Sequence, residues 1–418
     1  HVSPTCAPTR SALMTGRHEF RNGVTHTIFE RERLTLDATT VAEVLQENGY
    51  ATGIFGKWHL GDQAEYRPDQ RGFEETFIHG GGGIGQTYPG SCGDAPNNTY
   101  FHPTILHNGK FEKTRGYCTD VFFRQASIWI ESVKGDRLFF ASILLNAPHG
   151  PLLVRYEDEK RYAGKVPEHV AKYYGMIVNI DDNIGRLLDS LEQWRIERDT
   201  LVVFMNDNGG TNGIKIHNAG MRGGKNTPWL GGTRAASFWR WPGTIQPKDI
   251  DNLAAHIDFL PTVAELAGIE LSEKVEQQVE GLSLAPLLEN QGSSWPDRHL
   301  FTHLGRWAHG GFSQAKYSAC SVRSSRWHLV CKPEKKSKGW SSFEPGLHES
   351  DWKLYDVVAD PGESNDVAAS HPEVVKELDK AYDEWWDSLD GQLVNEDVEP
   401  PATNTFKDMY WEQFHNRF

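Results

Sequence analysis

Three short, uninterrupted apolar runs constrain the fold of this chain more than any other feature of its sequence. They cover residues 52–55, 138–145 and 201–205. Runs of this length without polar alternation are typical of parallel strands buried on both faces of a sheet. Between the last two lies an amphipathic stretch, residues 171–194, with apolar residues at helical spacing. Strands that alternate with helices predict an α/β fold with a central, mostly parallel sheet. The positions of the stretch that we expect in the core are Met176, Ile177, Ile180, Ile184, Leu187, Leu188 and Leu191.

Each apolar run is followed by a loop of polar residues. The loops are Gly-Lys-Trp-His at 56–59, Asn-Ala-Pro-His at 146–149 and Asn-Asp-Asn-Gly-Gly at 206–210. Open α/β sheets bind ligands outside the carboxyl ends of their strands, so we expect these three loops to share one site. The glycine-rich stretch 80–98 is predicted to be a long surface loop near that site.

Charge and hydropathy exclude several classes of function. The formal net charge of the 418 residues is −14, which argues against a nucleic-acid partner because phosphate binding requires a basic face. An anionic substrate would therefore need a local positive pocket. The sequence lacks a run of about 18 apolar residues, so we expect no membrane-spanning segment.

The five cysteines contain no Cys-x-x-Cys pair, which excludes the common zinc-ribbon spacings. Cys320 and Cys331 flank a segment that resembles a tight hairpin. If Cys6 has a chemical role, the other four cysteines either form two disulfides, as suits an oxidising compartment, or remain buried thiols. The sequence leaves both alternatives open.

The strongest motif runs from Cys6 to Arg17 and reads Cys-Ala-Pro-Thr-Arg-Ser-Ala-Leu-Met-Thr-Gly-Arg. Pro8 presets a turn at what resembles a helix start, and Cys6 lies near the positive end of that helix. Arg10 follows one turn later, where it can hold an anionic neighbour. By itself a buried structural cysteine would explain Cys-x-Pro-x-Arg. The whole segment, however, resembles the signature of the sulfatase family, in which this cysteine is oxidised to formylglycine.

Two of the loops after the strands resemble further motifs of that family. Lys57 and His59 lie two residues apart, so in an extended segment both face one anion; in the family, they bind the sulfate and the nucleophile. His149, in Asn-Ala-Pro-His, resembles the family histidine at the leaving-group side, and is our candidate for the general acid. The alternatives are a surface lysine with a capping histidine, and a histidine packed between turns.

The third loop resembles the family's metal-binding pair. Asp207 and Asn208 offer oxygen ligands, which favour Ca²⁺, with Mg²⁺ as the alternative, although Asp-Asn-Gly alone is an ordinary turn sequence. Family members usually begin with a strand that ends in two more metal-binding aspartates. That strand is absent from the chain as given, so the resemblance assigns as metal ligands the modified Cys6, Asp207 and Asn208. These three would hold Ca²⁺ poorly alone.

The segment 223–234 resembles the family's lysine motif, with Lys225 directed at the ester oxygen and sulfate. Leu230 stands where a glutamate is usual, which weakens the assignment of the subsite but not of the class. Further family motifs follow in order along nearly the whole chain. The resemblance implies an alkaline-phosphatase-like α/β sandwich with a large mixed, mostly parallel sheet flanked by helices, and a smaller α+β subdomain with a short antiparallel sheet.

We therefore expect two domains, a catalytic α/β domain over residues 1–290 and a smaller domain over 291–418. In the second, residues 317–332 are strand-like, 372–389 form a helix, and the acidic tail that follows is extended. The polar insert 332–350 is predicted to be a solvated hairpin tip.

The implied activity is hydrolysis of sulfate esters by formylglycine and a divalent metal, with a sulfated carbohydrate as the favoured substrate and a small aryl sulfate as the alternative. A maturation enzyme that installs formylglycine is the implied partner, in a periplasmic or secreted setting. Two alternatives remain: a phosphonate or phosphate ester hydrolase of the same superfamily, and an inactive homologue that binds sulfated glycans. Trp229, Trp307 and His309 either stack on sugars or, as most aromatic residues do, belong to the core.

Overall fold

A five-stranded mixed sheet forms the centre of the computed structural model, which describes residues 1–88, 90–289, 295–331 and 351–415. The insert 332–350 and the expected domain boundary at 290 lie outside these residues. The strand order is β4-β3-β2-β1-β5, and β1 is parallel to both β2 and β5. The strands are β1 (Ala51–Lys57), β2 (Glu75–His79), β3 (Thr104–His107), β4 (Lys110–Lys113) and β5 (Phe139–Leu144). The expected strands at 52–55 and 138–145 are therefore confirmed as neighbours in one parallel ladder.

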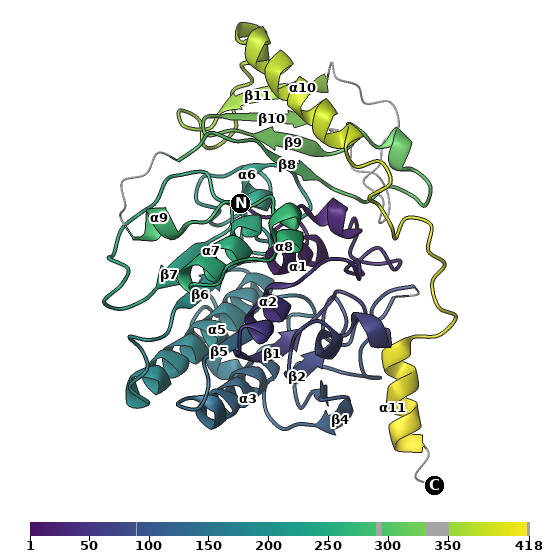
Figure 1. Cartoon of the computed structure of the whole chain (residues 1–418), viewed down its shortest axis with the longest axis vertical. Coiled ribbons are helices and arrows are strands. Elements are labelled where there is room, and N and C mark those ends of the chain that lie inside the picture. Colours follow the sequence, from purple (N-terminus) through teal and green to yellow (C-terminus); the bar gives the residue numbers. More distant parts are fainter. Residues whose placement is uncertain (89, 290–294, 332–350, 416–418) are drawn as a thin grey trace.

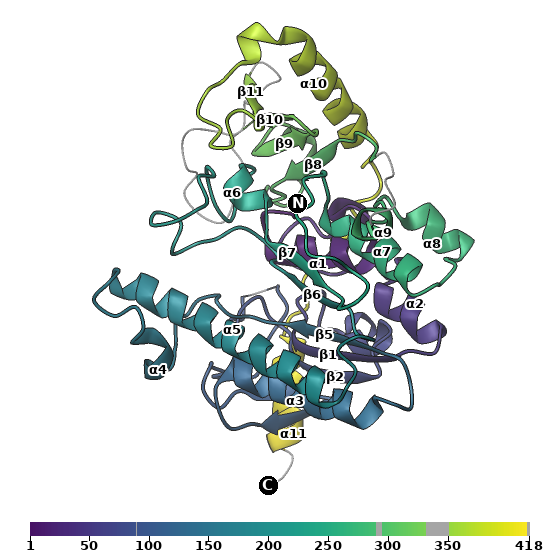
Figure 2. The same ribbon diagram turned by 90° about the vertical axis from the view of Figure 1, so that its left-hand side faces the viewer.

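Helices cover both faces of this sheet, which gives three layers (Figure 1, Figure 2). Because neighbouring residues of a strand point to opposite faces, Ile54 packs with the helices of one layer and Phe55 with those of the other. The first layer contains α1 (Cys6–Thr15), α2 (Val41–Glu47) and α7 (Phe259–Leu266); the second contains α3 (Cys118–Val133) and α5 (Glu168–Gln193). All seven residues of β1 are buried, as expected for a central strand. Shorter helices are α4 (Tyr156–Glu159), α6 (Leu230–Thr233), α8 (Glu273–Gln278) and α9 (Ala285–Leu288).

The third apolar run differs from the prediction. It forms β6 (Val202–Met205), which pairs antiparallel with β7 (Ser237–Arg240) in a separate two-stranded sheet and has no parallel neighbour in the described chain. All four residues of β6 are only partly buried. A cavity of about 1380 Å³ between β5 and β6 is the physical reason, because apolar side chains of both strands line it. Ile177 of α5, expected in the core, also lines this cavity and is 41% exposed.

A four-stranded antiparallel sheet with order β11-β10-β9-β8 forms the other end of the molecule, and α10 (Pro372–Asp387) packs on it (Figure 1). Its strands are β8 (Leu300–His303), β9 (Cys320–Arg323), β10 (Trp327–Cys331) and β11 (Lys353–Asp356). The expected hairpin is present, and Cys320 lies opposite Cys331 in its register. All five cysteines are nevertheless free thiols, so the structure has the thiol alternative rather than disulfides.

The tail is not simply extended. Its last part forms α11 (Thr405–His415), which packs against β4 at the far end of the molecule from α10 (Figure 1). Phe406 is fully buried there and its ring contacts Phe111 edge to face. The sequence did not predict α11, because this helix is anchored by a few aromatic residues and has no regular apolar stripe.

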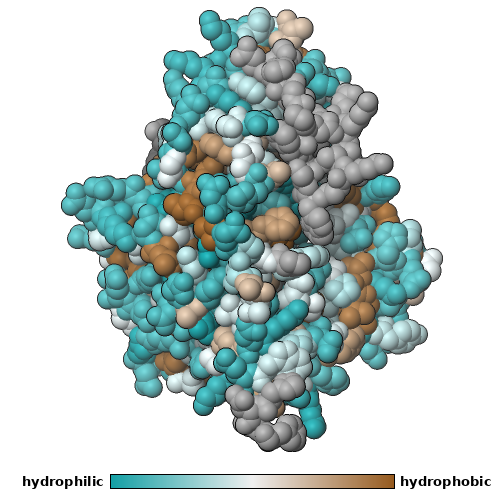
Figure 3. Space-filling view, turned by 90° about the vertical axis from the view of Figure 1, so that its right-hand side faces the viewer, coloured by the Kyte–Doolittle hydropathy of each residue, from teal (hydrophilic) through white to brown (hydrophobic). Residues whose placement is uncertain are grey.

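The face of the molecule in Figure 3 is predominantly hydrophilic, with hydrophobic residues in separate small groups. Charged residues make up 24% of the chain, an ordinary share for a globular domain, and they account for such a surface. Among the helices of the described ranges, none is both long and apolar enough to cross a bilayer.

Candidate active site

Cys6 is the first residue of α1, where the helix presents its positive end. Its Sγ lies 3.1 Å from Nζ of Lys225. Burial raises the pKa of the thiol, but the charges of Lys225 and Lys57 outweigh burial and lower this pKa to about 7. The sequence-based expectation of an activated cysteine at a helix start therefore agrees with the geometry.

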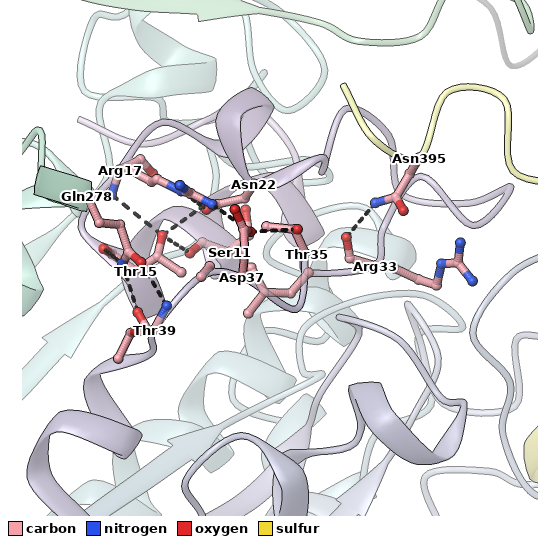
Figure 4. Close-up of polar contacts among 12 residues, drawn as sticks. Ser11, Thr15, Arg17, Asn22, Arg33, Thr35, Asp37, Thr39, Gln278 and Asn395 are labelled. Atoms are coloured by element: carbon pink, nitrogen blue, oxygen red, sulfur yellow. Dashed lines mark hydrogen bonds and ion pairs between the residues drawn. The ribbon is translucent and has the colours of Figure 1, made fainter. Parts of the chain in front are cut away.

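A polar network fixes the other end of α1 (Figure 4). Nε2 of Gln278 donates to the carbonyl oxygens of Thr15 and Thr39, at 2.7 and 2.8 Å. Nδ2 of Asn22 donates to Oγ1 of Thr15 at 2.8 Å, and Nε of Arg17 donates to Oδ1 of Asn22 at 2.6 Å. The Thr-Gly-Arg half of the motif thus holds the helix that presents Cys6.

Arg10 joins the ends of three strands. Its Nε and Nη2 both lie 3.2 Å from Oδ2 of Asp207. Its Nη1 donates to the carbonyl oxygen of Lys57 at 2.9 Å, and Nη2 also donates to that of Leu145 at 3.2 Å. The three loops predicted to share a site therefore meet at one guanidinium, and the anionic neighbour expected for Arg10 is Asp207.

Lys57 is the last residue of β1, and His59 follows two residues later. Both line the cavity beside Cys6. Burial lowers the pKa of Lys57 to about 8, although the Cys6 thiolate raises it. Nε2 of His59 lies 2.9 Å from the carbonyl oxygen of Thr27. Because a carbonyl oxygen can only accept a hydrogen bond, Nε2 carries the proton. Nδ1 is then a buried acceptor without a partner in the described chain, and burial and Lys57 hold the pKa of the ring well below its usual value.

His149 lies on the same cavity. Its Nδ1 donates to the carbonyl oxygen of Gly150 at 2.9 Å, which leaves Nε2 as the nitrogen available to a ligand. Burial and the charges of Lys225 and Lys57 lower the pKa of His149 to about 4. At this pKa the ring is neutral at pH 7, and a negative charge beside it would be needed for Nε2 to carry a proton.

Asp207 and Asn208 follow β6 and provide oxygen atoms suited to a hard cation. Burial raises the pKa of Asp207, while Arg10 and Lys57 lower it more strongly, to about 2. Oδ1 of Asn208 is buried and accepts no hydrogen bond within the described ranges, which is unusual unless a ligand completes it. The donors fit a divalent cation in type. In number they fall short, since no group of three or more His, Cys, Asp or Glu side chains in the described chain is arranged to hold a metal ion.

Main-chain contacts hold the Lys225 loop against the other loops. The N–H of Lys225 donates to the carbonyl oxygen of Gly210, and that of Asn226 donates to Pro4, both at 3.0 Å. Gly209 approaches this region so closely that a Cβ there would lie 1.9 Å from the carbonyl oxygen of Gly231. A side chain at residue 209 would therefore push the Asp207 loop away from the Lys225 loop.

The residue at the position of the family glutamate, Leu230, is buried and begins α6. Its N–H donates to the carboxylate of Glu363 at 2.9 Å, a residue of the C-terminal segment. Arg222 lies with its guanidinium 3.9 Å over the ring of Trp229 and donates to the carbonyl oxygen of Glu363. Trp229 is thus a core residue that supports the loop, and does not stack on a sugar.

The other two aromatic candidates, Trp307 and His309, also do not form a surface on which a sugar ring could stack. Trp307 is 2% exposed in the C-terminal core, and the exposed His309 lies within 4.0 Å of Asp397. The glycine-rich loop does reach the site, as expected, because a Cβ on Gly82 would meet His59 at 3.0 Å and one on Gly83 would meet His149 at 2.7 Å.

Sequence reasoning missed Arg306. It lies in the loop after β8 and lines the cavity together with Cys6. No spacing pattern links it to the motifs of the first 234 residues, so only the tertiary fold brings it to the site.

Comparisons with known proteins agree with this geometry. A sequence model described as Sulfatase matches residues 1–269, and one described as N-sulphoglucosamine sulphohydrolase, C-terminal, matches residues 232–386. Arylsulfatase A of Bos taurus is 28% identical over 89% of this chain and 76% of its own length. The uncharacterized sulfatase YdeN of Escherichia coli is 25% identical over 91% of this chain and 72% of its own.

Among solved structures, Ps i-CgsB in complex with k-i-k-neocarrahexaose superposes with a TM-score of 0.78, at 24% identity, over 98% of this chain and 87% of that one. BT4656 in complex with D-glucosamine-2-N,6-O-disulfate gives a TM-score of 0.68, at 20% identity, over 95% and 91%. The fold is therefore that of the sulfatases. With the family match over residues 1–269, the chain belongs to the sulfatase family and is a sulfuric ester hydrolase.

Proposed function

We propose that this enzyme hydrolyses sulfate esters of a carbohydrate, with a formylglycine made from Cys6 as the nucleophile. The observation that carries the proposal is the position of Cys6, with its Sγ 3.1 Å from Lys225 and with Lys57, His59 and His149 on the same cavity. Formylglycine would supply a hydrated aldehyde, of which one hydroxyl attacks sulfur and the other permits release of sulfate. A serine or unmodified cysteine lacks the second hydroxyl.

The surrounding side chains have separate roles in this proposal. Lys57 and Lys225 neutralise the sulfate oxygens, and Arg10 keeps Asp207 in place. His149 donates a proton to the leaving oxygen from Nε2; the negative sulfate offsets the cations that lower its pKa. His59 accepts the proton of the second hydroxyl at Nδ1, the nitrogen without a partner in the described chain.

A divalent cation, Ca²⁺ or alternatively Mg²⁺, would polarise the sulfate oxygens when bound. Asp207, Asn208 and the modified Cys6 are its proposed ligands, and this assignment is supported by Oδ1 of Asn208, which is buried and has no hydrogen-bond partner among the described residues. Ca²⁺ takes about six to eight oxygen ligands, so sulfate, water or further protein groups must complete the coordination.

A carbohydrate substrate is supported by two structural neighbours, which were solved in complex with a neocarrahexaose and with a glucosamine disulfate. Aryl sulfates are the proposed surrogate substrates, as the names of the arylsulfatase relatives indicate. We also propose a periplasmic or secreted location, a separate maturation enzyme that oxidises Cys6, and a division into a catalytic domain, residues 1–290, and a smaller domain, residues 291–418.

Peptide mass spectrometry and kinetics test the proposal together. Protein from a host able to install formylglycine should show a loss of roughly 18 Da at Cys6 and should hydrolyse 4-nitrophenyl sulfate. Cys6→Ala protein should show neither property. An unmodified Cys6 with retained binding of sulfated glycans would instead favour a binding protein, and a preference for phosphodiesters would favour a phosphoester hydrolase.

A further inference from the structure

Arg306 lies at the wall of the active-site cavity, and no carboxylate of the described ranges pairs with it. Its Nε is buried, and within the described chain its side chain makes no hydrogen bond or ion pair. A guanidinium taken partly out of water without a partner costs free energy, which a folded chain seldom retains without a use for the charge.

The main chain on both sides of Arg306 is rigidly held. Arg31 donates from Nη2 to the carbonyl oxygen of Gly305 at 2.6 Å and from Nη1 to that of Trp307 at 2.8 Å. Arg31 is itself paired with Glu396 at 2.8 Å, and the indole N–H of Trp307 donates to the same carboxylate at 2.6 Å. Both neighbours of Arg306 are thus fixed by buried polar contacts, while the side chain between them has none.

Close packing adds to this rigidity. A Cβ on Gly305 would lie 1.8 Å from the carbonyl oxygen of Thr25, so the loop is pressed against the segment that contains Thr27. Thr27 is the residue that accepts the hydrogen bond of His59. The loop of Arg306 and the catalytic histidine therefore share one support, and Arg306 is presented to the cavity at little entropic cost.

The electrostatic neighbours of Arg306 show which part of the cavity it faces. Burial lowers the pKa of Arg306, and Cys6 raises it. Burial lowers the pKa of Lys225, but Cys6 and Asp207 outweigh burial and raise this pKa, and Arg306 opposes them only weakly. Arg306 therefore lines the same cavity as Cys6 and Lys225 and acts on both through their charges.

We propose that Arg306 binds a second anionic group of the carbohydrate, a sulfate or a carboxylate, next to the sulfate that is cleaved. The inference rests on the proposed carbohydrate substrate. Both groups present oxygens in the plane of the guanidinium fork, which binds them in bidentate geometry. The sulfate to be cleaved already has Lys57 and Lys225, so Arg306 makes this enzyme selective for substrates with more than one negative charge.

The test compares ligands that differ by one anionic group. Wild-type and Arg306→Gln chains, both with Cys6→Ala to prevent turnover, are titrated calorimetrically with N-acetylglucosamine 6-sulfate, with glucosamine-2-N,6-O-disulfate and with a sulfated N-acetylhexosamine linked to a uronate. We expect the wild type to bind at least one dianionic ligand about tenfold more tightly than the monosulfate, and Arg306→Gln to abolish that preference. Comparison of the affinities for the disulfate and for the uronate-linked ligand shows whether the second anionic group is a sulfate or a carboxylate.

Several controls make the outcome decisive. Arg306→Lys should retain part of the preference, and Arg326→Gln, at an exposed arginine paired with Asp356, should retain all of it. Because no side chain in the described part of the chain pairs with the guanidinium, Arg306→Gln should leave the melting temperature unchanged or raise it, whereas replacement of an arginine with a purely structural role would lower it. Equal weakening of all three ligands, or no preference in the wild type, would overturn the proposal. Turnover of 4-nitrophenyl sulfate by the Cys6-containing enzyme tests the sulfatase mechanism separately.

Discussion

The imidazole of His328 and the carboxylate of Glu363 lie 2.6 Å apart, Nδ1 to Oε1, and both side chains are almost fully buried. The second oxygen of Glu363 accepts the N–H of Leu230, which lies five residues after Lys225. Glu363 follows β11, so its carboxylate joins His328 of the C-terminal sheet to the segment that carries Lys225.

Glu363→Gln should destabilise the protein by about 3 kcal/mol, because it removes the charge from a buried, hydrogen-bonded pair and leaves His328 with a weaker acceptor. Urea unfolding followed by tryptophan fluorescence measures the change. Glu373→Gln, at an exposed position of α10, should alter stability by less than about 0.5 kcal/mol. Equal stabilities of the two variants would show that the pair does not hold the Lys225 loop.

Lys225→Met should raise the pKa of the Cys6 thiol in the unmodified chain. Burial raises this pKa, and Lys225 is the largest of the charges that bring it down to about 7. Iodoacetamide labelling against pH, read by peptide mass spectrometry, should give a midpoint near 7 for the wild type and a higher one for the variant. Cys118, whose pKa burial raises well above the usual value, serves as an internal control that stays unlabelled at neutral pH. An unchanged midpoint would mean that Lys225 does not act on the thiol.

Activity should fall as the pH rises through about 8, because burial lowers the pKa of Lys57 and the protonated amine is the form that binds sulfate. In the unmodified chain, the charge of the Cys6 thiolate raises the pKa of Lys57. Modification of Cys6 removes that charge, so the alkaline limb of the pH profile should lie at or below a pH of about 8. Profiles of kcat/KM with 4-nitrophenyl sulfate measure the limb, since the ester does not titrate in this range. Lys57→Arg should move the limb upward, because arginine stays protonated; a limb that does not move would assign it to another group.

Ca²⁺ should raise the melting temperature of the wild-type protein, because a ligand that binds the folded state stabilises it. Asn208→Ala removes an Oδ1 that accepts no hydrogen bond from the described residues, and it should lower the Ca²⁺ affinity about tenfold, measured as a smaller shift of the melting temperature at each Ca²⁺ concentration. Asn48→Ala, at the end of α2 and away from the cavity, should behave as the wild type. A full Ca²⁺ response in Asn208→Ala would remove Asn208 from the ligand set.

The sequence predicted those parts of the fold and site that depend on local pattern. The apolar runs at β1 and β5, the helix that begins at Cys6 and the meeting of three polar loops at Arg10 all agree with the structure. The prediction that β6 is a parallel strand of the central sheet was wrong, because an apolar run specifies a strand but not its neighbour.

Residues that act through tertiary contacts were missed or misread. Arg306 and Glu363 come from a segment that is distant in sequence, and nothing in their local pattern marks an unpaired cation or a support for Leu230. Trp229 and Trp307 look equally suited to a sugar face or to a core, and only their burial decides between the two.

The network in Figure 4 imposes an order in time on the maturation of this protein. Nine of the ten residues of α1 are buried, and the residues that lock its surroundings are made late: Gln278 binds Thr15 across 263 positions, and Asn395 binds Gly23 across 372. The maturation enzyme proposed above would have to grasp the chain around Cys6 while those residues are still being synthesised or have not yet docked. Under the proposed function, a Cys6 that is not oxidised before these contacts form would remain a cysteine, so the fraction of active molecules would be set during folding and not afterwards.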